Sequence, residues 1–82
     1  MEGNLELSTE YIKNINQIYK NNIKSIAAKQ GKTLSDISNE LGMKSNYISN
    51  ACNKKDSLIN NGLLHRIMNL LNCSIAEISE GI

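Results

Sequence analysis

The chain has 82 residues and a formal net charge of +1 at pH 7, and it contains no proline, tryptophan or phenylalanine. This length allows one domain with a modest hydrophobic core. The sequence has no run of about 18 apolar residues, which a membrane-spanning helix requires, and residues 1–7 lack the apolar run of a secretory signal. We therefore expect a cytoplasmic protein without a membrane contact.

A long first helix is predicted to start at Ser8 or Thr9, which are good N-cap residues, and to end near Gln30. Gly31 follows directly, where a residue with positive φ commonly ends a helix. The apolar residues of this segment recur every three or four positions and form one stripe: Ile12, Ile15, Tyr19, Ile23, Ile26 and Ala27. The helix is longer than so small a domain requires. We therefore divide the chain into an acidic extension with the start of this helix at 1–16 and a domain at 17–82.

Residues 33–53 have the pattern of two short helices joined by a tight turn. Thr33 can cap the first of them, because its hydroxyl can accept a hydrogen bond from the first helical turn. Its apolar residues share one face: Leu34, Ile37 and Leu41. Gly42 can end this helix with a positive φ, and Ser38 is small where the second helix must pass close by. We expect Met43 to anchor the turn.

The second helix of this pair is predicted to open at Lys44 or Ser45 and to run to residue 53. Ile48 and Ala51 point inward at a spacing of three. Four polar or aromatic residues are left facing outward: Asn46, Tyr47, Ser49 and Asn50. Two helices joined in this way are typical of the helix-turn-helix motif, whose second helix enters the major groove of DNA. The alternative is a helical hairpin without a ligand.

Two further helices are predicted in the last third of the chain. One runs over residues 60–71 and has a wide apolar face: Leu63, Leu64, Ile67, Leu70 and Leu71. Asn72 can take the left-handed conformation that ends it. Ser74 and Glu77 form the capping box of a short fifth helix, in which we expect Ile75 and Ile78 to point inward.

Charge is divided unevenly along the chain. Residues 1–10 carry three glutamates, for a formal charge of −3. Residues 11–55 carry eight lysines against two acidic residues, for +6, whereas residues 56–82 carry one arginine against three acidic residues, for −2. The positive charge therefore surrounds the helix-turn-helix segment. Such a distribution favours a polyanionic partner on one face, although lysines can also serve only to keep a surface solvated.

Catalytic and metal-binding patterns are absent from the sequence. Cys52, Cys73 and His65 are far apart, and none of them falls at the spacing of a metal site. We expect two reduced thiols, while a Cys/His nucleophilic pair stays open without any third, orienting group. There is no paired-carboxylate motif and no glycine-rich phosphate loop. We therefore expect no enzyme activity, no metal, no cofactor and no small-molecule ligand.

From residue 22 to residue 81 the chain resembles the lambda-repressor/Cro-type helix-turn-helix domain, the xenobiotic-response-element family. The resemblance rests on residues 29–33, on Ile37-Ser38 and Leu41-Gly42, on residues 47–49, and on residues 70–78. It implies an all-α, five-helix domain, here with an extended first helix, that is usually dimeric and binds operator DNA. The family commonly has glutamine, which binds phosphate, where this chain has Leu34. One contact to the DNA backbone is thus missing or moved.

If the second motif helix, over residues 44–53, enters the major groove, its outward residues divide into two sets. The expected base contacts are Lys44, Ser45, Asn46 and Asn50, because lysine, serine and asparagine can bond to base edges. The expected contacts to the DNA backbone are Lys32, Thr33, Tyr47, Asn53, Lys54 and Lys55. For Tyr47 the alternative is partial packing against the domain.

The sequence predicts a small sequence-specific DNA-binding transcriptional regulator, Cro-like and of phage or mobile-element type. Its partner is double-stranded DNA. The few charges favour a homodimer, with the extended first helix, or Ile78 and Ile82, as candidate dimer surfaces. The alternative is a protein-interaction module on the same fold: an antirepressor, an inhibitor or an antitoxin-type partner. The low net charge, Leu34 and the acidic N-terminus favour that alternative.

Overall fold

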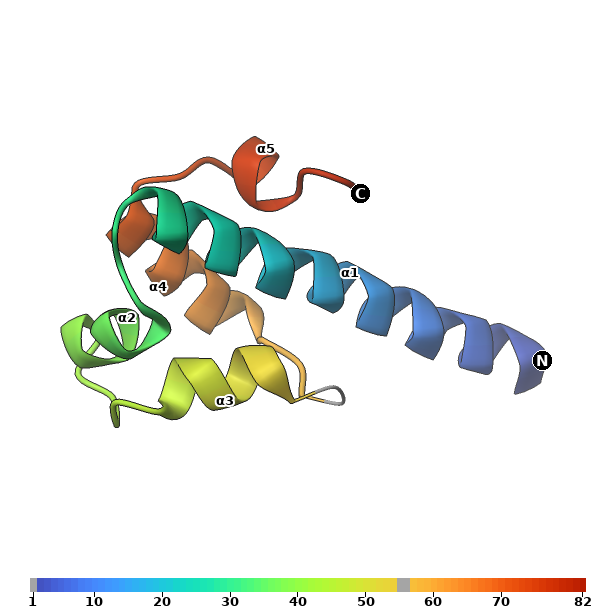
Figure 1. Cartoon of the computed structure of the whole chain (residues 1–82). Coiled ribbons are helices and arrows are strands. Elements are labelled where there is room, and N and C mark those ends of the chain that lie inside the picture. Colours follow the sequence, from blue (N-terminus) through green and yellow to red (C-terminus); the bar gives the residue numbers. More distant parts are fainter. Residues whose placement is uncertain (1, 55–56) are drawn as a thin grey trace.

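Helix α1 is the longest element, and four shorter helices fold against its C-terminal half (Figure 1). The computed structural model describes residues 2–54 and 57–82, with side chains described from residue 10 onward. In chain order the helices are α1 (Glu2–Lys29), α2 (Leu34–Glu40), α3 (Tyr47–Asn53), α4 (Asn61–Leu71) and α5 (Ile75–Ile78). No strand occurs in these described ranges. The prediction of an all-α, five-helix domain with an extended first helix is therefore confirmed.

Helix α1 begins at Glu2, so the predicted start at Ser8 or Thr9 was wrong. Residues 2–9 contain leucine and glutamate, which are good helix formers, and glutamates are favourable at a helix N-terminus. The end of α1 agrees with the prediction: Gly31 has φ +71°, and the N–H of Lys32 donates to the carbonyl of Ala27 at 2.8 Å. No described helix combines the length and the apolar character that crossing a membrane would require.

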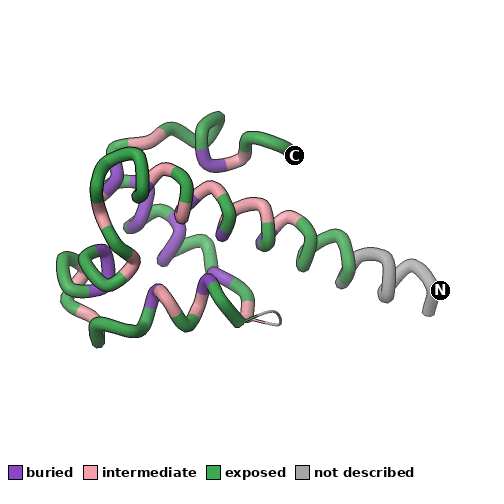
Figure 2. The backbone as a smooth tube through the Cα atoms, viewed as in Figure 1, coloured by how far each residue is buried: buried purple, intermediate pink, exposed green. Residues whose placement is uncertain are grey.

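The hydrophobic core lies between the C-terminal half of α1 and the other helices. Along α1 the buried residues described run from residue 16 onward, while the N-terminal half extends beyond the other helices (Figure 2). The core residues are Ile23, Ala27, Ile37, Ile48, Cys52, Ile59, Leu63, Leu64, Ile67, Met68, Leu71 and Ile78. The domain is thus built around the second half of α1, with α3 and α5 on opposite sides of it in Figure 1.

Two residues predicted to be buried are exposed. Ile12 is 48% exposed because it lies on the extending part of α1, and Ile75 is 57% exposed. Helix α5 is a single turn of four residues, and of its two isoleucines only the last one reaches the core. Ile78 takes that place and is fully buried, which removes it from the candidate dimer surfaces, whereas Ile82 is exposed.

The helix-turn-helix segment contains the caps that the sequence predicts. Thr33 is the N-cap of α2, and its hydroxyl accepts from the N–H of Asp36 at 3.0 Å. The carboxylate of Asp36 in turn accepts from the N–H of Thr33 at 2.9 Å, which completes a capping box. Gly42 has φ +74°, and the N–H of Met43 donates to the carbonyl of Ser38 at 2.9 Å. The first part of the turn between α2 and α3, at Gly42 and Met43, is therefore as predicted.

The last two helices begin close to where they are predicted to, and α4 also ends at the predicted residue. The side chain of Asn60 accepts from the N–H of Leu63 at 2.8 Å at the start of α4. Asn72 has φ +52° and ends α4 in the left-handed conformation. Ser74 and Glu77 form the predicted capping box of α5. Local side-chain chemistry thus determines these boundaries.

The capping box makes the stability of α2 dependent on pH. The hydrogen bonds from Thr33, first from its backbone and then from its side chain, lower the pKa of Asp36 from its ordinary value of 3.8. A carboxyl whose pKa is lower in the folded state contributes stability above its unfolded pKa, and that stability is lost as the pH falls through the folded pKa.

Asp36→Ala should therefore lower the free energy of unfolding at pH 7 and leave it close to wild type at a pH well below 3.8. Urea unfolding followed by circular dichroism from pH 7 to pH 2 measures this difference. Asn39→Ala is the control, since Asn39 is exposed on the same helix and its effect should not change with pH. A constant difference between wild type and Asp36→Ala over this range would contradict the assignment.

Candidate nucleic-acid interface

Helix α3 turns one face to the core and the other to solvent. Ile48 is fully buried and Cys52 is 3% exposed. Three residues predicted to face outward are exposed: Asn46, Tyr47 and Asn50. Ser49, the fourth, is half-buried, and its hydroxyl accepts from the side chain of Asn53 at 3.2 Å. The outward placement is thus confirmed for the first three.

The predicted start of this helix at Lys44 or Ser45 was wrong, since α3 begins at Tyr47 and the predicted helix 44–53 is Tyr47–Asn53. The carbonyl of Lys44 accepts from the N–H of Tyr47 at 2.9 Å, which closes a turn before the helix. Asn46 is the N-cap, with φ −97° and ψ 4°. Lys44, Ser45 and Asn46 are therefore exposed on the turn that leads into α3.

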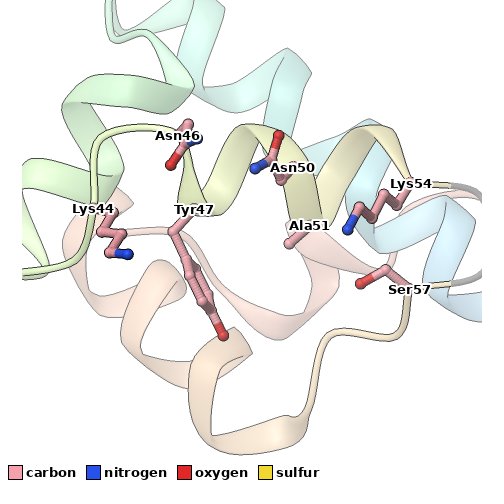
Figure 3. A pocket seen from close by; sticks show the side chains of 7 residues that line it. All are labelled: Lys44, Asn46, Tyr47, Asn50, Ala51, Lys54 and Ser57. Carbon is pink, nitrogen blue, oxygen red and sulfur yellow. The ribbon is translucent and has the colours of Figure 1, made fainter.

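An open cavity of about 400 Å³ lies beside the outer face of α3 (Figure 3). Its lining residues are Lys44, Asn46, Tyr47, Asn50, Ala51, Lys54 and Ser57. Lys44 and Lys54 lie at opposite ends in this view, with their ammonium groups pointing inward. Tyr47 is 49% exposed. The cavity brings predicted base-contacting residues together with Tyr47 and Lys54 from the backbone-contacting set, and it adds Ser57, which the sequence analysis did not single out.

The N-terminal end of α3 is held by a side chain from α2. The hydroxyl of Ser38 is fully buried, donates to the carbonyl of Leu34 at 3.0 Å and accepts from the N–H of Ile48 at 3.0 Å. The N-cap Asn46 makes no side-chain cap hydrogen bond with a described residue. Ser38 therefore satisfies an N–H in the first turn of α3 that would otherwise lack a partner. Sequence analysis predicted the small size of Ser38 but not this bond.

The C-terminal end of α3 is held by α1. The ammonium group of Lys20 donates to the carbonyl of Lys54 at 2.8 Å, and Lys20 is 1% exposed. The side-chain oxygen of Asn16 accepts from the N–H of Ile59 at 2.8 Å. Sequence analysis missed both residues, although a signal existed: residues 16, 20, 23 and 27 recur at steps of four, three and four. Two polar residues thus lie in the same buried row as Ile23.

The N-terminal end of α2 has internal partners for both residues predicted to touch phosphate there. The ammonium group of Lys32 lies 2.9 Å from a carboxylate oxygen of Glu40. The backbone N–H of Thr33 donates to Asp36, as described above. Contacts of Lys32 and Thr33 with DNA stay a prediction, and they would occur beside two carboxylates, those of Asp36 and Glu40.

A model of the Cro/C1-type HTH DNA-binding domain matches residues 22–81. The chain belongs to this family. The match confirms the resemblance inferred from the sequence, and it covers the same residues. A domain of this type is that of a DNA-binding regulator rather than an enzyme. Comparison with curated proteins and with solved structures finds no match.

The remaining residues of this Cro/C1-type domain that are predicted to contact the DNA backbone lie at the end of α3 and just after it. Asn53 is the last residue of α3 and is exposed, and its side-chain amide donates to the hydroxyl of Ser49. Lys54 is exposed and lines the cavity. Lys55 lies outside the described residues. The base and backbone contacts themselves stay predictions, because the structure contains the domain alone.

The two cysteines of the Cro/C1-type domain are free thiols. Burial raises the pKa of the Cys52 thiol, and burial, followed by the nearby Glu77, raises that of Cys73. A raised pKa keeps a thiol protonated at neutral pH and makes it a poor nucleophile. His65 is exposed on α4. The arrangement gives no support to a Cys/His nucleophilic pair.

Ser38→Ala should lower the free energy of unfolding by about 1–3 kcal/mol, because the buried N–H of Ile48 loses its partner. Alanine fits the space, so the effect comes from the lost hydrogen bond rather than from a clash. Urea unfolding measures it, with Ser35→Ala as a control because Ser35 is exposed on the same helix. Equal stability of the two variants would contradict the role given to the Ser38 hydroxyl.

Proposed function

We propose that this protein is a sequence-specific transcriptional regulator, Cro-like and of phage or mobile-element type, that places α3 in the major groove of double-stranded DNA. The family identifies a DNA-binding domain. The observation that carries the finer proposal is the exposed pair of amides, Asn46 at the N-cap of α3 and Asn50 on its outer face, between two lysines. This is the side-chain chemistry that reads base edges.

The spacing of the two amides fits a readout of nearby base pairs. Asn46 and Asn50 are four residues apart, about 6 Å along a helix at 1.5 Å per residue. Successive base pairs are about 3.4 Å apart, so the two amides would address bases roughly two steps apart. An asparagine can bond to adenine through both N6 and N7, whereas Lys44 and Ser45 can bond to other base edges. We infer an operator that contains adenine at two such positions.

Contacts to the DNA backbone are proposed mainly at the C-terminal end of α3. Lys54 and Ser57 line the cavity there, and Tyr47 and Asn53 are exposed on α3 itself. At α2, by contrast, Leu34 stands in place of a phosphate-binding glutamine, and Asp36 and Glu40 would repel phosphates. One domain therefore makes few phosphate contacts, which supports a homodimer that binds two half-sites about 34–36 Å apart.

Selection of bound sequences from a random duplex pool should yield an adenine-containing palindrome. The double variant Asn46→Ala plus Asn50→Ala should then lose at least roughly 30-fold in affinity for it, from about 1–3 kcal/mol per bidentate pair. A matched double variant, Asn61→Ala plus Asn69→Ala, removes two exposed asparagines from α4 and should bind like wild type. Fluorescence anisotropy measures both affinities.

The logarithm of the binding constant should fall linearly with the logarithm of the salt concentration, since each phosphate contact releases counterions. The titration covers about 50 to 300 mM salt, which brackets the physiological value of about 0.15 M. A binding constant that does not change over this range would count against DNA binding. Equal losses in the two double variants would count against the proposed readout.

Dimer formation is proposed through the extending half of α1. Tyr11 is 62% exposed and Ile12 is 48% exposed, side by side in the sequence and before the first buried residue described on α1. An isolated helix shorter than about 12–15 residues is marginally stable in water, so a partner helix packed on this part of α1 would stabilise it. Ile82 is 58% exposed and is the competing candidate at the C-terminal end.

Ile12→Asp should therefore convert the protein to a monomer and weaken binding to a palindromic operator, because a charge would be buried between the two α1 helices. Sedimentation velocity with and without the duplex measures the mass. Ile82→Asp is the comparison and should remain dimeric. A monomeric wild type on DNA would contradict the dimer, and dissociation by Ile82→Asp alone would move it to the C-terminal end.

A protein-interaction module is the second candidate function, and the surface of α2 favours it. Helix α2 is unfavourable for a phosphate contact, because it carries the apolar Leu34 and the negatively charged Asp36 and Glu40. Exposed apolar surface is present on α1, at Tyr11 and Ile12. Such a module would act as an antirepressor, an inhibitor or an antitoxin-type partner. It would keep its partner when Asn46 and Asn50 are both changed to alanine, and would lose it in Ile12→Asp.

A further inference from the structure

Lys20 is a fully buried lysine in a domain of 82 residues. Burying a charged group away from water is unfavourable unless it is well paired, and an apolar side chain of similar length would fill the same space without that cost. The partner of its ammonium group is the carbonyl of Lys54, at 2.8 Å. The role of Lys20 therefore depends on which part of the fold this carbonyl belongs to.

The carbonyl belongs to the C-cap of α3. The last carbonyls of a helix lack intrahelical partners and carry its partial negative charge, so an ammonium group there is favourable both as a donor and as a cation. Because α3 has seven residues, a bond at this end and the Ser38 bond at the other end determine where the whole helix lies.

A second contact from α1 holds the chain just beyond α3. Asn16 lies one turn before Lys20, and its side-chain oxygen accepts from the N–H of Ile59 at 2.8 Å. Its amide nitrogen donates to the carbonyl of Ile12 at 3.2 Å, which orients the side chain. The two bonds hold the chain at Lys54 and at Ile59, on either side of Ser57. Lys54 and Ser57 both line the candidate interface.

We propose that Lys20 is a positioning residue for DNA binding. Its ammonium group holds the backbone of Lys54, sets the placement of the C-terminal end of α3, and keeps the Lys54 side chain at the end of the cavity where phosphate is expected. Lys20 is 1% exposed and does not itself touch DNA. The proposal rests on the proposed function, because it assigns how that same surface is held.

Gln30, the residue directly after α1, provides a matched control for an ordinary stabilising role. Its side chain donates to the carbonyl of Leu71 at 2.6 Å, at the end of α4. This bond has the same chemical form as the Lys20 bond, a side-chain donor and a carbonyl at a helix C-terminus, but the carbonyl is on α4 rather than α3. Loss of the Gln30 bond should therefore affect stability without changing the interface.

The experiment compares Lys20→Met with Gln30→Ala on the selected duplex. Affinity is measured over a range of salt concentrations and corrected for the folded fraction that urea unfolding gives for each variant. Lys20→Met should bind roughly tenfold more weakly at about 0.1 M salt and should reduce the salt slope by about 1, as expected when one phosphate contact is lost. Gln30→Ala should keep the wild-type affinity and slope.

A double-mutant cycle identifies the route of the effect. If Lys20 acts by placing Lys54, then Lys54→Ala should reproduce the loss, and Lys20→Met combined with Lys54→Ala should be no weaker than either single variant. If Lys20→Met does not fold, Asn16→Ala replaces it, because it releases the same segment at Ile59 and should reduce the salt slope in the same way.

Two results would overturn the positioning role while DNA binding stands: equal corrected affinities for Lys20→Met and Gln30→Ala, or additive losses in the cycle. Failure of the proposed function is a different result, since wild-type protein would then select no sequence and show no salt dependence.

Discussion

Short helices require partners for their ends, and this constraint governs the whole domain. A helix leaves four N–H groups and four carbonyls without intrahelical partners, so α2, α3 and α5, with four to seven residues each, are almost entirely made of such ends. Side chains from elsewhere supply the missing bonds. On the carbonyl side these are Lys20 for α3, Gln30 for α4, Asn22 for α5 and Arg66 for α2. Two of the four come from α1 and a third from the residue directly after it, so α1 and its C-terminal end support three of the other helices.

The predictable part of the fold is the part in which cause and effect are close in sequence. The caps at Thr33, Asn72 and Ser74 each depend on residues within a few positions, and all three were predicted correctly. The start of α3 was placed two or three residues early because its first-turn N–H is satisfied by Ser38, ten positions back on another helix. Asn46 is a common N-cap residue type, but its side chain makes no cap hydrogen bond with a described residue.

The candidate site shows the same division. The outward face of α3 follows from helical spacing, and the exposure of Asn46 and Asn50 could be predicted from it. The bond from Lys20 to Lys54 spans 34 positions, so the partner could not be inferred, and its burial was missed because a lysine is normally taken as a surface residue. The sequence indicates that Asn16 and Lys20 are buried only when the helical spacing of Ile23 and Ala27 is continued toward the N-terminus of α1.

The chain contains a natural reporter of movement in α3. Cys52 lies on the core face of that helix at 3% exposure, and the one other cysteine, Cys73, is half-buried beyond α4. A thiol-reactive reagent can reach Cys52 only when α3 separates from the core, so its labelling rate measures how often this helix opens in the native protein. Cys73 serves as an internal reference in the same molecule, and the opening of α3 becomes measurable without introducing a probe.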